Sequence, residues 1–311
     1  MPINQPSPRP KKWPRTALKL AVPLLVAFFI GRSIYGNWQQ VRSEPWQLDA
    51  GYLALSFVLA SGWFLARPYG WTLVINCFGH AVPFGEIYRV YRKSELSRYV
   101  PGGVWQFASR VYLVRKYGVE PSACLAATLV DMVLAALAAM VPAVWVIATA
   151  LPQLAEYQRA VLMAFPVLSF AVVHPRVLNL WAGFLSRLAR QPYTPIRISA
   201  VRLFGIWAMY VGAWVGLAFA MAFFVRALLP STNSSLTFIA GSYALAWVSA
   251  LLTMVAPAGI GIREGILGLL LTGVLAAGTG LAVAVAIRIW LVLMELAWWA
   301  AGHWFPHADN E

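Results

Sequence analysis

The sequence predicts an all-α polytopic membrane protein with about seven to eight transmembrane helices and two segments broken by proline and glycine. Only 11% of the 311 residues are charged and 60% are hydrophobic, whereas about a quarter of a soluble chain is charged. Several windows also exceed the roughly 18 to 20 apolar residues that cross a hydrocarbon core. Helices are the expected form because they satisfy their backbone hydrogen bonds internally.

The chain divides into a short tail and one membrane domain. Residues 1–15 are proline-rich and basic and predict a disordered cytoplasmic tail, residues 16–304 predict a single transmembrane domain, and residues 305–311 predict a C-terminal tail. A shorter apolar piece at 266–275 precedes the last span. The expected spans are residues 17–36, which lack a convincing signal-peptide cleavage site, and 50–78, 121–150, 159–173, 203–228, 236–256 and 281–304.

Two further segments, 84–93 and 177–190, mix basic and apolar residues and predict helices lying on the membrane surface. Basic residues also set the expected orientation. Of the 24 Lys and Arg residues, 17 fall in residues 1–19, 79–120 and 174–202, while the alternate connections hold only Arg42. The positive-inside rule then predicts a multi-pass protein of the bacterial cytoplasmic (inner) membrane with a cytoplasmic N-terminus.

The net charge of +13 is explained by this orientation and by anionic lipid headgroups, so nucleic acid is not an expected partner. Enzyme signatures are also missing from the sequence. It contains no HExxH, GxSxG or Walker motif and no zinc-type cysteine cluster, and its four histidines lack metal-ligand spacing. The sequence therefore predicts a protein that is not an enzyme and holds no metal or cofactor.

Two breaks interrupt the apolar pattern 156 residues apart. Pro101 begins one and is followed by two glycines; Pro257 begins the other and is followed by Ala258 and Gly259. Each break precedes a short charged helix and then a long span, which indicates a weak internal repeat. Paired Gly/Pro-interrupted segments are the usual sequence mark of a transporter's central site. An ordinary interfacial turn at "VPGGV" is the simpler alternative.

The number of spans between the breaks bears on the repeat. Four predicted spans separate the two breaks, which would place both on the same side of the membrane. Either the repeat is parallel or one predicted span is wrong, and the short segment 159–173 is the most suspect.

The first break has the chemistry of an anion site. A helix that begins after Gly102 and Gly103 presents unpaired backbone N–H groups and the positive end of its dipole, which suit a phosphate. Gln106, Ser109 and Arg110 then share one helix face. Irregular backbone is tolerated at membrane depth only beside protein or a watery cavity, so we expect a re-entrant hairpin that lines a polar cavity.

Four ionisable residues lie inside predicted spans: Arg67, Asp131, Arg288 and Glu295. Each costs about 3 kcal/mol on insertion scales and is a functional candidate by default. Asp131 is predicted either to pair with a buried arginine such as Arg67 or Arg288, or to act in transport. Arg288 and Glu295 are seven residues apart and share a helix face, which is equally compatible with a static network between helices.

The stretches "RYVPGGVWQFASRVYLVRKYGV" and "APAGIGIREGILGLLL" resemble the paired signatures of the lysylphosphatidylglycerol synthase transmembrane region, also called the flippase-like membrane protein family. The resemblance runs from about residue 20 to 303. Gly103 and Ala258 depart from the lysine and glycine that are common there. The resemblance implies a helical domain that moves modified phospholipids or polyprenyl-linked glycans between leaflets, without the soluble aminoacyl-transferring domain of some members.

The resemblance also implies the substrate-binding residues. Arg98, Arg110 and Arg263 would pair with phosphate, Gln106 would hydrogen-bond to it, and Glu264 or Asp131 would balance charge. One alternative is a non-catalytic membrane subunit that anchors or regulates a lipid- or glycan-modifying enzyme. Another is a transporter of small soluble anions. The full set of candidate positions is Arg98, Pro101, Gly102, Gly103, Trp105, Gln106, Arg110, Pro257, Gly259, Gly261, Arg263 and Glu264.

Overall fold

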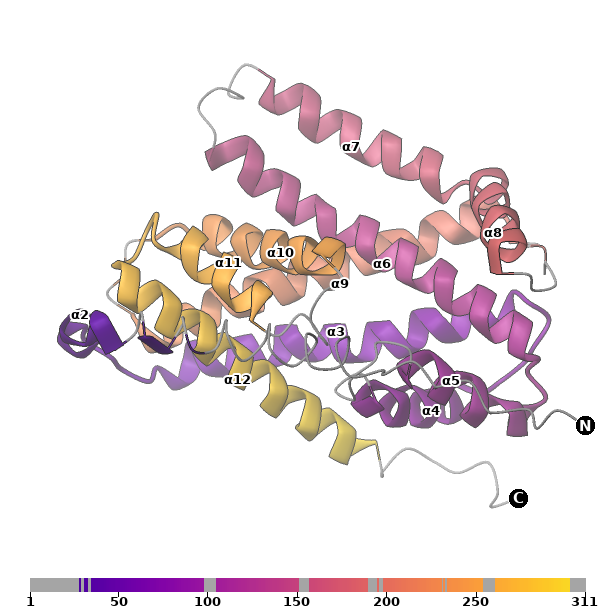
Figure 1. The fold of residues 1–311 in the computed structure, drawn as a ribbon, viewed down its shortest axis with the longest axis horizontal. Helices are drawn as coiled ribbons and strands as arrows, with labels where there is room; N and C mark the ends of the chain where they lie inside the picture. The colour runs from indigo at the N-terminus through magenta and orange to yellow at the C-terminus, as the bar shows by residue number, and fades with distance from the viewer. Residues whose placement is uncertain are drawn as a thin grey trace, which may run out of the picture.

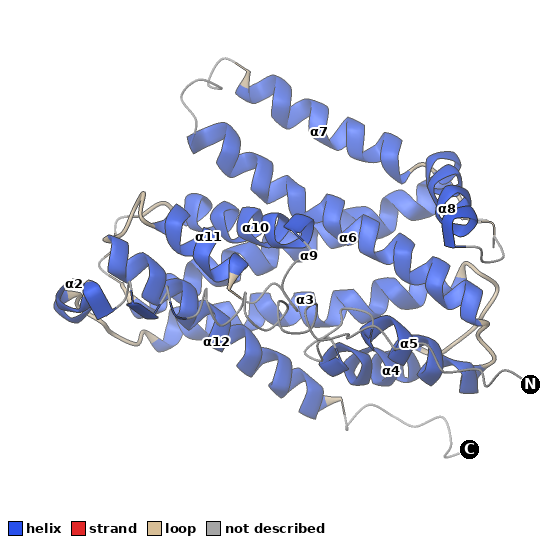
Figure 2. Cartoon of the chain, viewed as in Figure 1, coloured by secondary structure: helices blue, strands red, loops and turns tan. Residues whose placement is uncertain are grey.

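A computed structural model describes residues 28, 31–32, 35–97, 105–150, 157–189, 195, 198–230, 232, 234–253 and 261–302. All regular structure in this part of the chain is helical, as Figure 2 shows, which confirms the predicted all-α fold. The elements are α2 (Trp38–Ser43), α3 (Ala50–Asn76), α4 (Phe84–Leu96), α5 (Trp105–Val114), a 3-10 helix (Arg115–Tyr117), α6 (Pro121–Ala150), α7 (Gln158–Val173), α8 (Pro175–Ala189), α9 (Ala200–Leu228), α10 (Leu236–Thr253), α11 (Ile262–Leu271) and α12 (Ala277–Ala301).

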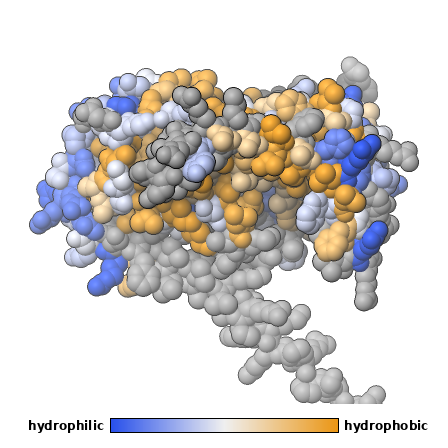
Figure 3. Space-filling model, turned by 90° about the horizontal axis from the view of Figure 1, so that it is seen from above, coloured by the Kyte–Doolittle hydropathy of each residue, from blue (hydrophilic) through white to orange (hydrophobic). Residues whose placement is uncertain are grey.

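Four of these helices, α3, α6, α9 and α12, are long and apolar enough to cross a membrane. Their bounds lie within a few residues of the predicted spans, and α6 coincides with its span. The predicted tails at 1–15 and 305–311 and most of the first span lie outside the described residues. The surface in Figure 3 carries an apolar band across its middle, with hydrophilic residues toward both ends. The chain is therefore a multi-pass helical membrane protein.

The antiparallel pair α3 and α9 forms the centre of the bundle (Figure 1). The backbone N–H of Gln47, just before α3, donates to the carbonyl of Leu228 at the end of α9, 3.0 Å away. At the opposite end, Arg202 near the start of α9 reaches Cys77 after α3 at 3.6 Å. These contacts define two ends of the bundle, called here the Gln47 end and the Cys77 end.

Helices α4 and α5 form a first hairpin that opens at the Cys77 end. Tyr117, which follows α5, donates a hydrogen bond to Glu86 in the first turn of α4. At the closed end, the hydroxyls of Ser97 and Ser109 are 3.1 Å apart. The connection between the two helices, residues 98–104, lies outside the described residues. Helix α4 covers the segment 84–93 that was predicted to lie on the membrane surface; it has many buried residues and packs against α3 and α5.

Helices α10 and α11 pack together as a second hairpin that opens at the Gln47 end. The hydroxyl of Ser234, just before α10, donates to the carbonyl of Val274, just after α11, at 3.3 Å. Arg226 near the end of α9 donates to the Ser234 carbonyl at 3.3 Å, which fixes this opening beside α9. Residues 254–260, which connect the two helices, lie outside the described residues. The two hairpins thus open at opposite ends of the bundle.

This arrangement corrects the span count made from the sequence. The predicted span 236–256 is α10, which turns back through α11 instead of leading to the other end of the bundle. The segment 159–173, which seemed the most suspect, is α7, and Figure 1 shows it running back beside α6. Four helices, α6, α7, α8 and α9, therefore separate the two hairpins in the sequence, and three of them, α6, α7 and α9, run along the bundle between its two ends.

The last helix, α12, connects the two ends of the bundle. Near its start, Thr279 donates to Glu44 at 3.1 Å, at the Gln47 end. Near its end, Arg92 of α4 donates to the carbonyl of Trp299 at 2.6 Å, and Tyr88 donates to the carbonyl before it at 2.8 Å. Helix α12 therefore ends against the first hairpin.

Close backbone packing between α6 and α10 depends on one glycine. A Cβ atom at Gly241 would lie 2.6 Å from the Cβ of Val146 and 2.8 Å from the carbonyl oxygen of Pro142. We expect Gly241→Ala to lower the stability of the folded protein by about 1 to 3 kcal/mol, because neither neighbour can move without shifting a helix. Thermal unfolding in detergent measures the change.

Gly212→Ala is the matched control, because a Cβ atom at Gly212 in the middle of α9 meets nothing within 4 Å. Alanine should leave stability unchanged or raise it by about 0.5 to 1 kcal/mol. Equal unfolding temperatures for the two variants would contradict the close contact of α6 with α10.

Candidate functional site

The carboxylate of Asp131 on α6 is fully buried where α3, α6 and α9 meet. Arg67 of α3 lies 2.9 Å from its Oδ2 and donates to its Oδ1 at 3.1 Å. Tyr210 of α9 donates a further hydrogen bond to Oδ1. Arg67 precedes the end of α3 by nine residues, which at about 1.5 Å per residue places the pair about 14 Å inside the bundle from the Cys77 end.

Arg110 brings the first hairpin into the same network. Its side chain is 1% exposed, and its Nη2 lies 2.6 Å from Glu95 Oε1 on α4. Its Nε donates to the hydroxyl of Ser94 at 3.2 Å, and its Nη1 lies 3.9 Å from Asp131 Oδ2. Gln106 also donates to the Glu95 carboxylate. The positive charges of Arg67 and Arg110 are thus balanced by the carboxylates of Asp131 and Glu95 inside an apolar bundle.

Aromatic rings surround the two arginines. The ring of Tyr91 is centred 4.2 Å from the guanidinium carbon of Arg110 and 6.0 Å from that of Arg67. The ring of Trp71 lies 5.1 Å from Arg110, and its N–H donates to Thr128 at 3.2 Å. Such cation–π contacts offset part of the cost of removing an arginine from water. We call Arg67, Arg110, Asp131 and Glu95 the first charge cluster.

Sequence reasoning found three of these four charged groups and missed the fourth. Glu95 lies in a short polar helix, where a carboxylate normally faces solvent, and so it gave no signal of burial. Tyr91 precedes Glu95 by four residues and shares its helix face, so it was missed with Glu95. Tyr210 gave no local signal, since its partner Asp131 is 79 residues away.

A second charge cluster forms at the start of α11. Glu264 accepts a hydrogen bond from the backbone N–H of Gly261 at 2.6 Å, and its other oxygen lies 3.5 Å from Arg288 of α12 and 3.9 Å from Arg263. Gly261 has φ of +89°, a conformation that favours glycine. The ring of Tyr243 on α10 is 5.8 Å from the guanidinium of Arg263.

The remaining predicted residues are less closely grouped. Arg288 pairs with Glu264, so Arg67 and not Arg288 is the buried partner of Asp131. Glu295 is also buried on α12. Trp105 at the start of α5 is half exposed. The positions Arg98, Pro101, Gly102, Gly103, Pro257 and Gly259 lie outside the described residues.

Aromatic rings lie between the two clusters. Arg67 is 5.5 Å from the ring of Trp63, which packs at 4.7 Å against Trp214 of α9. Trp214 contacts the ring of Tyr243 at 6.3 Å, and Tyr243 leads to Arg263. The structure therefore links the two sets of charged residues through a series of packed rings.

A hollow of about 370 Å³ lies away from both clusters, between the loops at the Gln47 end. Its lining includes Glu44, Thr232 and Thr272, together with residues 273–276. Glu44 is its one charged lining residue and already accepts from Thr279. Among the described residues, no three His, Cys, Asp or Glu side chains form a group that could hold a metal ion. The charge clusters are therefore the stronger candidate site.

Membrane-length helices with charged groups gathered in their interior define a polytopic membrane protein with an internal polar site. The sequence profile of the lysylphosphatidylglycerol synthase TM region matches residues 16–298. Because this match covers nearly the whole sequence, the chain belongs to that family, as its two motifs indicated. A search of curated proteins found no match.

The Arg67–Asp131 pair makes a direct prediction for stability. Asp131→Asn should destabilise the protein by about 3 to 5 kcal/mol, because Arg67 would remain buried with no carboxylate opposite it. Combining this change with Arg67→Gln removes both charges and should recover more than half of the loss. Denaturant unfolding in detergent provides the comparison; a single variant as stable as the wild type would contradict a buried pair.

Proposed function

We propose that this chain is a lipid translocase that moves the headgroup of a phospholipid or polyprenyl-linked lipid between leaflets and performs no covalent chemistry. The first charge cluster is the observation that carries the proposal. Buried ion pairs rarely add net stability, because their desolvation offsets their attraction. Charged groups inside a membrane domain instead mark pathways for polar substrates. Membership of a lipid-related membrane family agrees with this function.

The proposed substrate contact is an exchange of ion-pair partners. A lipid phosphate presents oxygens that match the planar donor fork of arginine, as a carboxylate does. Arriving phosphate would replace Asp131 at Arg67 and Glu95 at Arg110. The displaced carboxylates would then face a cationic group of the lipid headgroup or take up protons. The charge of the site stays balanced throughout, which lowers the cost of occupying a buried position.

We further propose that both hairpins are re-entrant and enter from opposite faces of the membrane. Leaving aside the short α8, an odd number of helices that run along the bundle, α6, α7 and α9, separates them, and their open ends lie at opposite ends of the bundle. This is the relation expected of an inverted repeat. The excess of Lys and Arg in residues 79–120 and 174–202 supports a cytoplasmic Cys77 end and a cytoplasmic N-terminus in a bacterial inner membrane.

Cysteine labelling tests this topology. In a chain with Cys77 and Cys124 replaced by alanine, a cysteine at Lys116 marks the opening of the first hairpin and one at Thr272 marks that of the second; both positions are exposed. We expect an impermeant maleimide to label position 272 in intact spheroplasts and position 116 only in inverted vesicles. Labelling of both from one face would refute the opposed arrangement.

Lipid exchange in proteoliposomes tests the function. Arg110→Gln should lower the exchange of fluorescent phosphatidylglycerol at least tenfold, about the effect of losing one charge-assisted contact. The double variant Glu95→Gln with Arg110→Gln leaves no unpaired carboxylate, so it should fold as the wild type does and still exchange slowly. Arg115→Gln, at an exposed arginine of the following 3-10 helix, is the matched control and should exchange normally.

The same preparation separates the competing functions. Wild-type exchange rates in the folded double variant would mean that Arg110 has a structural role only. A wild-type protein that exchanges no lipid alone but co-purifies with a lipid- or glycan-modifying enzyme would instead support an anchoring subunit. Uptake of a soluble anion without lipid movement would support an anion transporter.

A further inference from the structure

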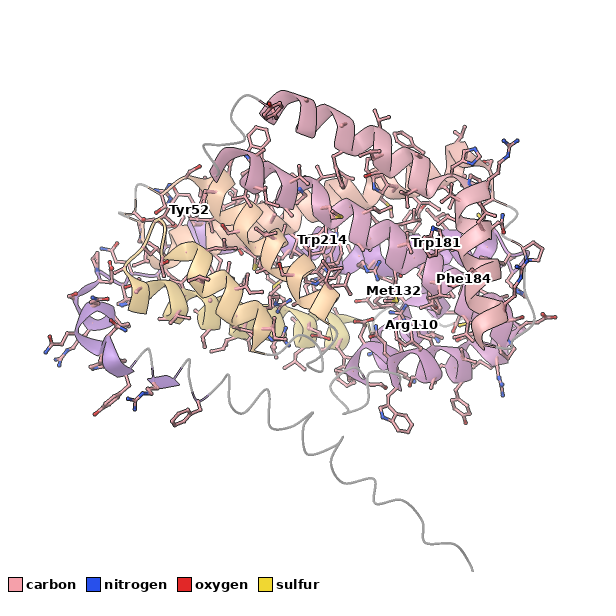
Figure 4. All side chains as sticks on the ribbon, turned by 45° about the horizontal axis from the view of Figure 1, so that its top comes forward. Tyr52, Arg110, Met132, Trp181, Phe184 and Trp214 are labelled. Carbon is pink, nitrogen blue, oxygen red and sulfur yellow. The ribbon has the colours of Figure 1, made fainter. Side chains whose placement is uncertain are left out.

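Trp214 occupies the middle of the path between the two charge clusters. It is residue 15 of the 29 in α9, and Figure 4 places it between Tyr52 near the Gln47 end and Arg110 toward the other end. Its ring packs 4.7 Å from Trp63, the ring nearest it on the side of Arg67, and 6.3 Å from Tyr243, which contacts Arg263. Trp214 is therefore connected to the first charge cluster through the ring of Trp63 and to the second through the ring of Tyr243.

The indole N–H of Trp214 is buried and finds no hydrogen-bond acceptor in the described part of the chain. A buried donor without a partner carries a desolvation penalty that folding does not recover. Other tryptophans of this protein avoid that penalty by donating to side-chain or carbonyl oxygens, namely Trp46, Trp71, Trp290 and Trp298. An unpaired N–H at the centre of the bundle thus calls for an acceptor that the described residues do not supply.

We infer that the Trp214 N–H donates a hydrogen bond to a phosphate oxygen of the headgroup as it passes from the first charge cluster to the second. This inference rests on the proposed translocase function and assigns that function a third polar contact. The faces of the intervening rings repel an anion because they carry partial negative charge, whereas a ring edge and an N–H attract it. Between Arg67 and Arg263, the buried Trp214 N–H is a donor free of any competing acceptor among the described residues.

If the Trp214 N–H contacts the headgroup, its removal should slow lipid exchange without unfolding the protein. Trp214→Phe keeps an aromatic ring against Trp63 and Tyr243 but removes the N–H. Because loss of the unsatisfied donor offsets the cost of the smaller ring, the variant should unfold close to the wild-type temperature. Lipid exchange should nevertheless fall about tenfold, as expected for the loss of one hydrogen bond to a charged group. A residue that served packing alone would show neither a selective loss of exchange nor retained stability.

Trp207→Phe is the matched control. Trp207 lies two turns earlier on the same helix, is buried, and also has an indole N–H without an acceptor among the described residues. Its ring contacts Phe204 at 5.4 Å and does not take part in the chain of rings between Arg67 and Arg263. Exchange by Trp207→Phe should match the wild type. Normal exchange by Trp214→Phe, or equal losses in the two variants, would overturn the assignment.

The experiment uses the full chain in vesicles of egg phosphatidylcholine with fluorescent phosphatidylglycerol as the reporter, and a second arm measures uptake of radiolabelled inorganic phosphate. Slowed lipid exchange by Trp214→Phe supports the inference with a lipid phosphate as the acceptor. If the wild type takes up phosphate and Trp214→Phe slows that uptake alone, the donor role stands and the anion is a free one. If the wild type moves neither, the translocase proposal and this inference both fail. If Arg110→Gln slows exchange and Trp214→Phe does not, only this inference fails.

Discussion

The buried carboxylate of Asp131 is the group on which the arrangement of the central helices depends. It accepts from Arg67 and Tyr210 and also lies opposite Arg110, so one oxygen pair holds α3, α6, α9 and the first hairpin in a fixed relation. In a medium of low dielectric constant, a charge is tolerated only when an opposite charge and hydrogen bonds stand close to it. Two arginines in this position require two carboxylates, and Glu95 supplies the second.

The hairpins follow from the same requirement. If α4 crossed the whole bundle, it would carry its acidic and basic residues through the apolar region. Instead α4 ends at Leu96, so that Glu95 lies beside Arg110. The second hairpin uses glycine for the corresponding purpose. Gly261, at φ of +89°, lets the chain enter α11 with its backbone N–H directed at Glu264, which places that carboxylate against Arg288. Both short helices thus begin or end at a charged group.

Sequence analysis recovers what hydropathy and local residue patterns determine. Apolar runs are long and bounded by polar residues, so the helix bounds and the all-α class were predictable, and an aspartate inside such a run indicated a buried arginine partner. Hydropathy cannot tell a span from the arm of a hairpin, because α10 is as apolar as α9 and its pairing with α11 is seen only in tertiary contacts such as that of Ser234 with Val274. The burial of Glu95 could not be predicted either, because its helix is polar and Glu95 is covered only by tertiary packing.

The contact between α4 and the end of α12 gives the domain a clasp. The guanidinium of Arg92 binds the carbonyl of Trp299 and stacks over its ring at 5.5 Å, and a helix C-terminus carries partial negative charge that favours such a cation. The last helix is thereby tied to the first hairpin, although more than 200 residues separate them in the sequence. Because α11 of the second hairpin also packs against α12, this one helix joins the two hairpins.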